Sequence, residues 1–156
     1  MSIVDPSRPD ILAFMAAASS ALGRPLAKPK DVFHFGGASS TLADERLLLA
    51  IQGKKTATTS WPVPDPLYWG VGDLSVILDG RGAPKALMRT TSIVKCRFCE
   101  VDEGFAAAEA EGDYEEYRTG HIAFYREQEK GDEFKDDSVV MCETFEIIYS
   151  AVGAQT

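Results

Sequence analysis

Residues 53–60 read Gly-Lys-Lys-Thr-Ala-Thr-Thr-Ser, and they join a predicted helix to a predicted strand. Gly53 is the expected end of the helix, because glycine is the residue most often found just after a helix C-terminus. The β-branched residues within 56–61 favour a strand. This turn therefore brings two lysines and several hydroxyl groups to the start of a strand. A solvated lysine pair followed by an ordinary threonine-rich strand is the alternative interpretation.

The segments on both sides of this turn predict an α+β fold. Upstream, apolar residues at three- and four-residue spacing predict helices between Asp10 and Gly23 and from Ser40 or Thr41 to Ile51. The other predicted elements are a short strand or extended turn at 31–37, strands at 56–61, 74–78, 86–98 and 138–151, and helices at 101–111 and 113–130. No βαβ alternation is present, so we expect a mainly antiparallel, curled sheet that closes into a β-barrel with helices outside.

Two connections between the predicted strands have clear signals. The range 79–84 reads Asp-Gly-Arg-Gly-Ala-Pro, which predicts a hairpin that pairs 74–78 antiparallel with 86–98. Prolines at 62, 64 and 66 exclude regular structure from the segment after the threonine-rich strand. We therefore expect a surface loop that carries Tyr68 and Trp69.

Length, composition and charge limit the functional classes. The 156 residues, 45% of them hydrophobic, suit one domain, which we divide into an N-terminal helix and linker (1–30), the domain proper (31–151) and a tail (152–156). With 24 acidic and 16 basic residues the net charge is -8, which disfavours broad DNA binding but allows a local basic cleft. The first residues lack a signal-peptide pattern and no apolar run would span a bilayer, so we expect a cytoplasmic protein without membrane contact.

The three cysteines raise the question of a metal or redox site. Cys96 and Cys99 have C-x-x-C spacing, and Cys142 with His34 or His121 would complete four ligands. Residues three apart in a strand point to opposite faces, however, and a reducing cytoplasm disfavours disulfides. We predict no zinc, no Cys96–Cys99 disulfide and no other cofactor.

A family resemblance connects these observations. The pattern Gly53-x-Lys55-x-x-Thr58 resembles the signature of the ASCH family, and specifically a bacterial branch in which it reads Gly-x-Lys-Thr-Ala-Thr. The resemblance covers roughly residues 31–151 and also includes Gly72-Asp73-Leu74, Leu78-Asp79-Gly80, Phe105-Ala106, Glu111-Gly112-Asp113, His121 and the range 139–145. It implies a PUA-like β-barrel with flanking helices and a cleft used for RNA.

The resemblance also implies candidate catalytic residues. Some small bacterial members are amidohydrolases that remove the acetyl group of N(4)-acetylcytidine, and others are described as ribonucleases. Their lysine, threonine and later glutamate correspond to Lys55, Thr58 and Glu111, with Glu109 as the rival glutamate. The chain has Ser60 where the amidohydrolase signature has an arginine, which leaves the substrate open.

Chemical reasoning gives these three residues distinct roles. A lysine desolvated beside another cation, here Lys54, can act as a base that activates a threonine hydroxyl to attack a carbonyl. Glu111 would give a proton to the departing amine. The scheme requires Lys55 to lie in the turn before the strand, since positions 55 and 58 of a flat strand face opposite sides. We expect Lys55→Ala to abolish turnover and to leave the fold intact.

An aromatic stripe on the helix 113–130 is the remaining candidate. It is either core or a set of rings that stack a base while His121 binds a phosphate or a base edge. The residues that we expect to bind substrate are Lys54, Ser60, Trp69, Tyr117, Arg118 and His121. The sequence thus predicts a metal-independent hydrolase acting on RNA or a modified nucleoside, with a non-catalytic RNA-binding module of the same fold as the alternative. It does not predict the oligomeric state.

Overall fold

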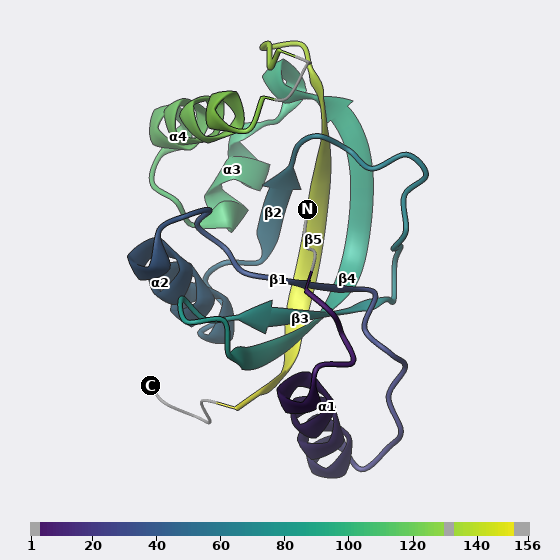
Figure 1. Cartoon of the computed structure of the whole chain (residues 1–156). Coiled ribbons are helices and arrows are strands. Elements are labelled where there is room, and N and C mark those ends of the chain that lie inside the picture. Colours follow the sequence, from purple (N-terminus) through teal and green to yellow (C-terminus); the bar gives the residue numbers. More distant parts are fainter. Residues whose placement is uncertain (1–3, 130–132, 152–156) are drawn as a thin grey trace.

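The computed structural model describes residues 4–129 and 133–151, and its elements follow the predicted order (Figure 1). The helices are α1 (Pro9–Leu22), α2 (Ser40–Ile51), α3 (Glu103–Glu109) and α4 (Tyr114–Glu127), and a 3-10 turn occupies Phe98–Glu100. The strands are β1 (Asp31–Phe33), β2 (Ala57–Ser60), β3 (Leu74–Leu78), β4 (Pro84–Arg97) and β5 (Val139–Ser150). Helix α4 ends at Glu127, and the predicted helix end at Lys130, like the tail 152–156, lies outside the described residues.

The five strands form one mixed sheet in the order β1-β3-β4-β5-β2. Strands β3 and β4 pair antiparallel, as the hairpin signal predicted. The long strand β5 pairs antiparallel with both β4 and β2, whereas β1 pairs parallel with β3. The α+β class is confirmed, but the sheet is only mainly antiparallel.

The predicted closure into a barrel is wrong for the part of the chain that the structure describes. Strands β1 and β2 are the two edges of the sheet and do not pair with each other. Helix α2 explains the gap, because Leu47 packs in one cluster with Ile77 of β3 and Phe145 of β5. A helix therefore fills the space that a further strand pairing would need.

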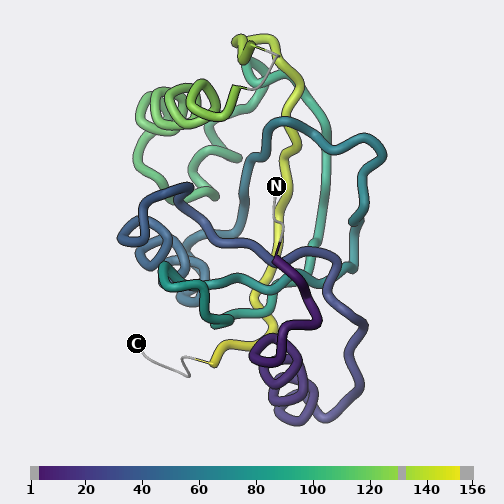
Figure 2. The backbone as a smooth tube through the Cα atoms, in the orientation of Figure 1, coloured from purple at the N-terminus to yellow at the C-terminus, as the bar shows by residue number. Residues whose placement is uncertain are grey.

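Helix α1 packs against β1, β3 and β4 and shares a hydrophobic core with them (Figure 2). Ile11 and Ala18 are completely buried and Phe14 is nearly so. They belong to one cluster with residues of β1, β3 and β4, namely Val32, Leu74, Val76, Leu78 and Leu87. The amphipathic pattern that predicted this helix is thus explained by its buried face.

Helices α3 and α4 cover the face of the sheet next to β2. Tyr117 and Tyr125 of α4 lie in one buried cluster with Val140 and Cys142 of β5. Asp113 caps α4, accepting from the Glu116 backbone N–H at 2.8 Å. None of the described helices is long and apolar enough to span a membrane.

Candidate functional site

Lys55 lies in the turn before β2, as the proposed chemistry requires. Helix α2 ends at Ile51, and Gly53 has a φ of 77°, a left-handed conformation that glycine adopts without steric cost. The backbone N–H groups of Lys54 and Lys55 both donate to the Leu49 carbonyl, at 2.9 and 3.1 Å. The strand begins only at Ala57, so the turn and not the strand determines where the Lys55 side chain points.

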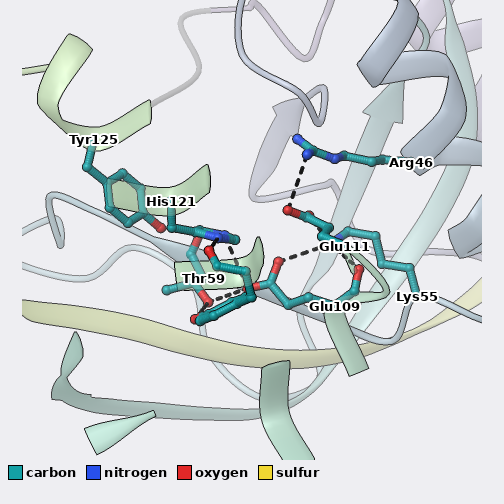
Figure 3. Close-up of polar contacts among 8 residues, drawn as sticks. Arg46, Lys55, Thr59, Glu109, Glu111, His121 and Tyr125 are labelled. Carbon is teal, nitrogen blue, oxygen red and sulfur yellow. Dashed lines mark hydrogen bonds and ion pairs between the residues drawn. The ribbon is translucent and has the colours of Figure 1, made fainter. Parts of the chain in front are cut away.

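The Lys55 ammonium group is held by two glutamates (Figure 3). Its Nζ donates to the carbonyl and Oε1 of Glu109, at 3.0 and 3.1 Å, and to Oε2 of Glu111 at 2.9 Å. Nζ also lies 5.0 Å from the centre of the Phe35 ring, within the range of a cation–π contact. Lys55 and Glu109 are each only 1% exposed, so this is a buried ion pair.

A left-handed residue brings both glutamates to the same lysine. Helix α3 ends at Glu109, and the next residue, Ala110, has a φ of 58°. Among the described residues Ala110 is the non-glycine residue with positive φ, a conformation that costs free energy when a Cβ is present. The turn reverses the chain between Glu109 and Glu111, so both side chains can reach Lys55.

The second oxygen of Glu109 is bound by residues of β2 and α4. The Thr59 hydroxyl donates to Glu109 Oε2 through a short hydrogen bond, and the Tyr117 hydroxyl lies 2.7 Å from the same Thr59 oxygen. His121 Nε2 lies 3.4 Å from Glu109 Oε2. The Tyr125 hydroxyl donates to the Thr59 carbonyl at 2.9 Å, so α4 is fixed to β2 at this point.

Two pKa values in this network shift in opposite directions. Burial alone would raise the pKa of Glu109, but Lys55, His121 and Thr59 outweigh it and lower the pKa to about 2. Burial would lower the pKa of His121, yet its contact with Glu109 raises it. His121 Nδ1 lies 2.8 Å from the Tyr117 carbonyl, so both ring nitrogens face acceptors, which favours the doubly protonated imidazolium.

Glu111 is the part of the network that reaches solvent. Its Oε1 lies 3.3 Å from Nη2 of Arg46 in α2, and the two side chains are 12% and 27% exposed. Arg46, Glu111 and Lys55 thus form a chain of charges that runs from the surface into the buried ion pair (Figure 3).

The remaining predicted residues lie in different surroundings. Lys54 is exposed beside the site. Thr58 and Ser60 are half-buried and lie opposite Glu143 and Met141 of β5, on the face of β2 that Thr59 does not share. The hydroxyl that reaches Glu109 is therefore that of Thr59, which the sequence interpretation missed because the family signature directs attention to Thr58.

Three predicted substrate-binding residues on α4 and the loop already have protein partners. Tyr117 is buried inside the network, behind Glu109. Arg118 donates to Asp136 at 2.6 Å and lies over the Phe98 ring, 5.2 Å from its centre. The Trp69 side chain hydrogen-bonds to Glu143 on the opposite face of the sheet.

The segment that contains the sheet and the Lys55 network also matches a known protein family. The ASCH domain family model matches residues 31–149. The chain belongs to the ASCH domain family. A crystal structure from Enterococcus faecalis V583 is 25% identical and superposes with a TM-score of 0.81, covering 94% of this chain and 97% of that one. An ASCH domain from Lactobacillus crispatus JV V101 is also 25% identical, with a TM-score of 0.79 over 91% and 96% of the two chains. No curated protein matches the chain.

One group of side chains in this ASCH domain has the composition of a metal site. Among the described residues, ligand atoms of Glu109, Glu111 and His121 all lie within 4.8 Å of one another. The Lys55 ammonium already binds both carboxylates, so a metal ion would have to displace it. The three side chains therefore suit the Lys55 ammonium group better than a divalent metal ion.

Of the three cysteines of the ASCH domain, Cys142 lies beside this network, since it pairs with Thr59 of β2 and packs in one cluster with Tyr117. Cys142 is buried, Cys96 is half-buried and Cys99 is exposed, and all three are free thiols. The nearest sulfur pair is not the C-x-x-C pair but Cys96 and Cys142 on neighbouring strands, with 3.5 Å between the Sγ atoms. Burial and the adjacent Cys96 raise the pKa of Cys142 well above its usual range, which disfavours the reactive thiolate form.

The shifted pKa of Glu109 predicts how acid affects the stability of the domain. A carboxyl whose pKa falls from 4.5 to about 2 on folding stabilises the protein above 4.5, and this contribution is lost as the pH falls toward 2. The raised pKa of His121 acts in the opposite sense, and its contribution is fully present below 6.5. Urea unfolding at pH values on either side of 4.5 should therefore show a loss of stability on acidification that is smaller in Glu109→Gln. An identical pH dependence in the two proteins would contradict the assignment.

Proposed function

We propose that this ASCH domain is a metal-independent hydrolase that acts on RNA or a modified nucleoside, with an N(4)-acylated cytidine as the model substrate. The supporting observation is the chain of charges from Arg46 through Glu111 to the buried Lys55–Glu109 pair. Glu111 is 12% exposed and is held in place by Arg46 and Lys55, and a positioned carboxylate within reach of solvent is a candidate for general acid–base catalysis.

The contacts of Lys55 change its expected role. An ammonium group that donates to three oxygens has no lone pair with which to accept a proton, so Lys55 does not serve as the base. It instead fixes the position of Glu111. Tyr117 and His121 are buried and contact Thr59 and Glu109, so they act on Glu111 only through these residues and Lys55. These residues position the catalytic carboxylate and do not touch the substrate.

Glu111 is then the residue that transfers protons. A water molecule attacks the substrate carbonyl while Glu111 accepts one of its protons, and the Arg46 guanidinium stabilises the resulting oxyanion. When the carbon–nitrogen bond breaks, Glu111 returns the proton to the departing amine. One water is consumed, and the products are a carboxylic acid and a free amine.

The sequence-based role of Thr58 as a nucleophile does not fit this arrangement. Thr58 lies opposite Glu143, on the face of β2 that Thr59 does not share, so water is the nucleophile of the proposed reaction. Thr58→Ala should therefore retain turnover in the product assay, and a loss of turnover would show that the hydroxyl attacks instead. Lys54 is exposed and adjacent to Lys55, so it is the cation that we expect to contact the phosphate of the substrate, whereas Ser60 shares the Thr58 face of β2 and lies away from this network.

A non-catalytic RNA-binding module is the second candidate function. Lys55 is only 1% exposed, and this observation favours a role for the ion pair in holding α3 against β2. In that case the solvent-accessible cations Arg46 and Lys54 would bind RNA without changing it.

Product analysis distinguishes the two functions. The purified protein is incubated with N(4)-acetylcytidine, other acylated cytidines and short RNAs, and the products are followed by mass spectrometry. We expect release of acetate or another acid from at least one acylated cytidine, or cleavage of an RNA, at a rate proportional to protein concentration. Binding of RNA with every substrate recovered unchanged would refute the hydrolase and support the binding module.

A further inference from the structure

Two of the three cysteines face each other on the neighbouring strands β4 and β5 (Figure 1). The Sγ atoms of Cys96 and Cys142 are 3.5 Å apart. Cys96 lies opposite Val140, which is two residues from Cys142 in the same strand, so both thiols point to one face of the sheet. Both also pack in the cluster beneath α4. Strand pairing therefore brings together two sulfur atoms that are far apart in the sequence.

The two thiols are close enough to react with each other. The sulfur atoms of a disulfide are about 2.05 Å apart, so the two Sγ atoms must approach by roughly 1.5 Å. Cys96 and Cys142 are diagonal neighbours in the strand pair and not directly opposite. The approach therefore requires rotation of both side chains together with a small shift of the strands. Both thiols are free in the structure, so the bond would be a product of oxidation and not part of the resting fold.

The two cysteines differ in their access to solvent. Cys96 is half-buried, whereas Cys142 is 7% exposed. Burial also raises the pKa of Cys142, which disfavours its thiolate. An oxidant that arrives from solvent therefore reacts first with Cys96. Cys142 remains beside it as the thiol that completes a disulfide.

Cys99 is the rival partner of Cys96, because it lies only three residues away. It belongs to the 3-10 turn Phe98–Glu100, where its backbone N–H donates to the Asp136 carbonyl at 2.8 Å. Its side chain is exposed, whereas those of Cys96 and Cys142 pack in the cluster beneath α4. The C-x-x-C spacing is therefore not the pair that the fold brings together.

We infer that Cys96 and Cys142 form an oxidation site at which hydrogen peroxide converts the two thiols into a disulfide between β4 and β5. The sulfur of Cys96 first attacks the peroxide, the oxygen–oxygen bond breaks, and a sulfenic acid and one water form. The sulfur of Cys142 then attacks the sulfenic sulfur, and the hydroxyl group leaves with the thiol proton as a second water. Two electrons pass from the thiols to the peroxide. The inference goes beyond the proposed hydrolysis, since neither step uses the Lys55 network.

Peptide mapping tests the site because trypsin cuts on both sides of Cys96. Cleavage after Lys95 and Arg97 separates Cys96 from Cys99 and from Cys142, so each possible disulfide gives a different linked peptide. The folded protein is treated with a small molar excess of hydrogen peroxide, the remaining thiols are alkylated, and the unreduced digest is analysed by mass spectrometry. We expect the Cys96–Cys142 peptide as the main cross-link. Titration in urea should find one thiol in place of the three in the sequence, and dithiothreitol should restore all three.

Matched variants and an unfolded control show whether the fold selects this pair. Cys99→Ser should form the same cross-link as the wild type. Cys96→Ser should form no cross-link to Cys142, and because this side chain is only half-buried the variant serves even if Cys142→Ser does not fold. In protein unfolded by urea, the Cys96–Cys99 pair should predominate, because closing a short loop costs less entropy than closing a long one.

Three results would overturn the inference. The first is that the folded wild type keeps all three thiols after peroxide treatment. The second is that Cys96 is oxidised to a sulfinic or sulfonic acid without a cross-link to Cys142, which would show that the second thiol does not reach it. The third is that Cys96–Cys99 is the main cross-link in the folded protein.

Discussion

Replacing Lys55 with methionine is expected to lower the free energy of unfolding by about 3–5 kcal/mol, because removal of one partner strands a buried charge. Methionine has a similar length, so the loss of the ammonium dominates the change. Glu109 is 1% exposed and would keep a carboxylate with one fewer cation. This expectation replaces the sequence-based one, in which Lys55 was a cleft residue whose replacement leaves the fold intact.

Urea denaturation with matched variants measures the effect. Lys54→Met alters the exposed neighbour and should change stability by no more than about 0.5 kcal/mol. The double variant Lys55→Met with Glu109→Gln should recover part of the loss, because the unpaired charge is then removed as well. A Lys55→Met protein as stable as the wild type would show that the pair contributes little.

Replacing Glu111 with glutamine is expected to lower kcat/KM for the hydrolysed substrate by at least about 100-fold, the usual lower value for a general acid–base residue. The amide oxygen can still accept from Lys55, and the side chain is only partly buried, so the fold should survive. Initial rates at low substrate concentration give the ratio directly.

Glu115→Gln is the matched control for this measurement. Glu115 lies in the first turn of α4, is exposed, and carries the same charge four residues from Glu111. Its replacement should leave kcat/KM within about two-fold of the wild type, since surface substitutions away from the site have small effects. Equal activity of Glu111→Gln and wild type would exclude Glu111 as the proton-transfer residue.

The sequence was sufficient to predict the helices and strands and the position of Lys55 in the site. Helices α1 and α2 and the β3–β4 hairpin depend on local signals, namely apolar spacing, end glycines and a turn motif, and these act wherever the chain folds. Lys55 was located correctly in a turn because Gly53 is a strong local signal as well. The two glutamates were named but could not be separated.

The structure shows why the choice between Glu109 and Glu111 had no single answer. Both glutamates bind Lys55 because Ala110, which lies between them, has a left-handed backbone conformation. Alanine rarely adopts this conformation, so the sequence does not predict it. The sequence analysis chose Thr58, whereas the hydroxyl that contacts Glu109 is that of Thr59. The register of the strand alone decides which of the two hydroxyls faces α3. Register and sheet closure are both set by long-range pairing, which local patterns do not contain.

The folding unit begins with helix α1 and not with the first strand. The family match starts at residue 31, yet the buried side chains of Ile11, Phe14 and Ala18 complete the core beneath β1, β3 and β4. A fragment cut at the family boundary would expose this apolar surface to water and offer it to other chains. The segment that the family model matches is therefore shorter than the segment whose side chains form this core.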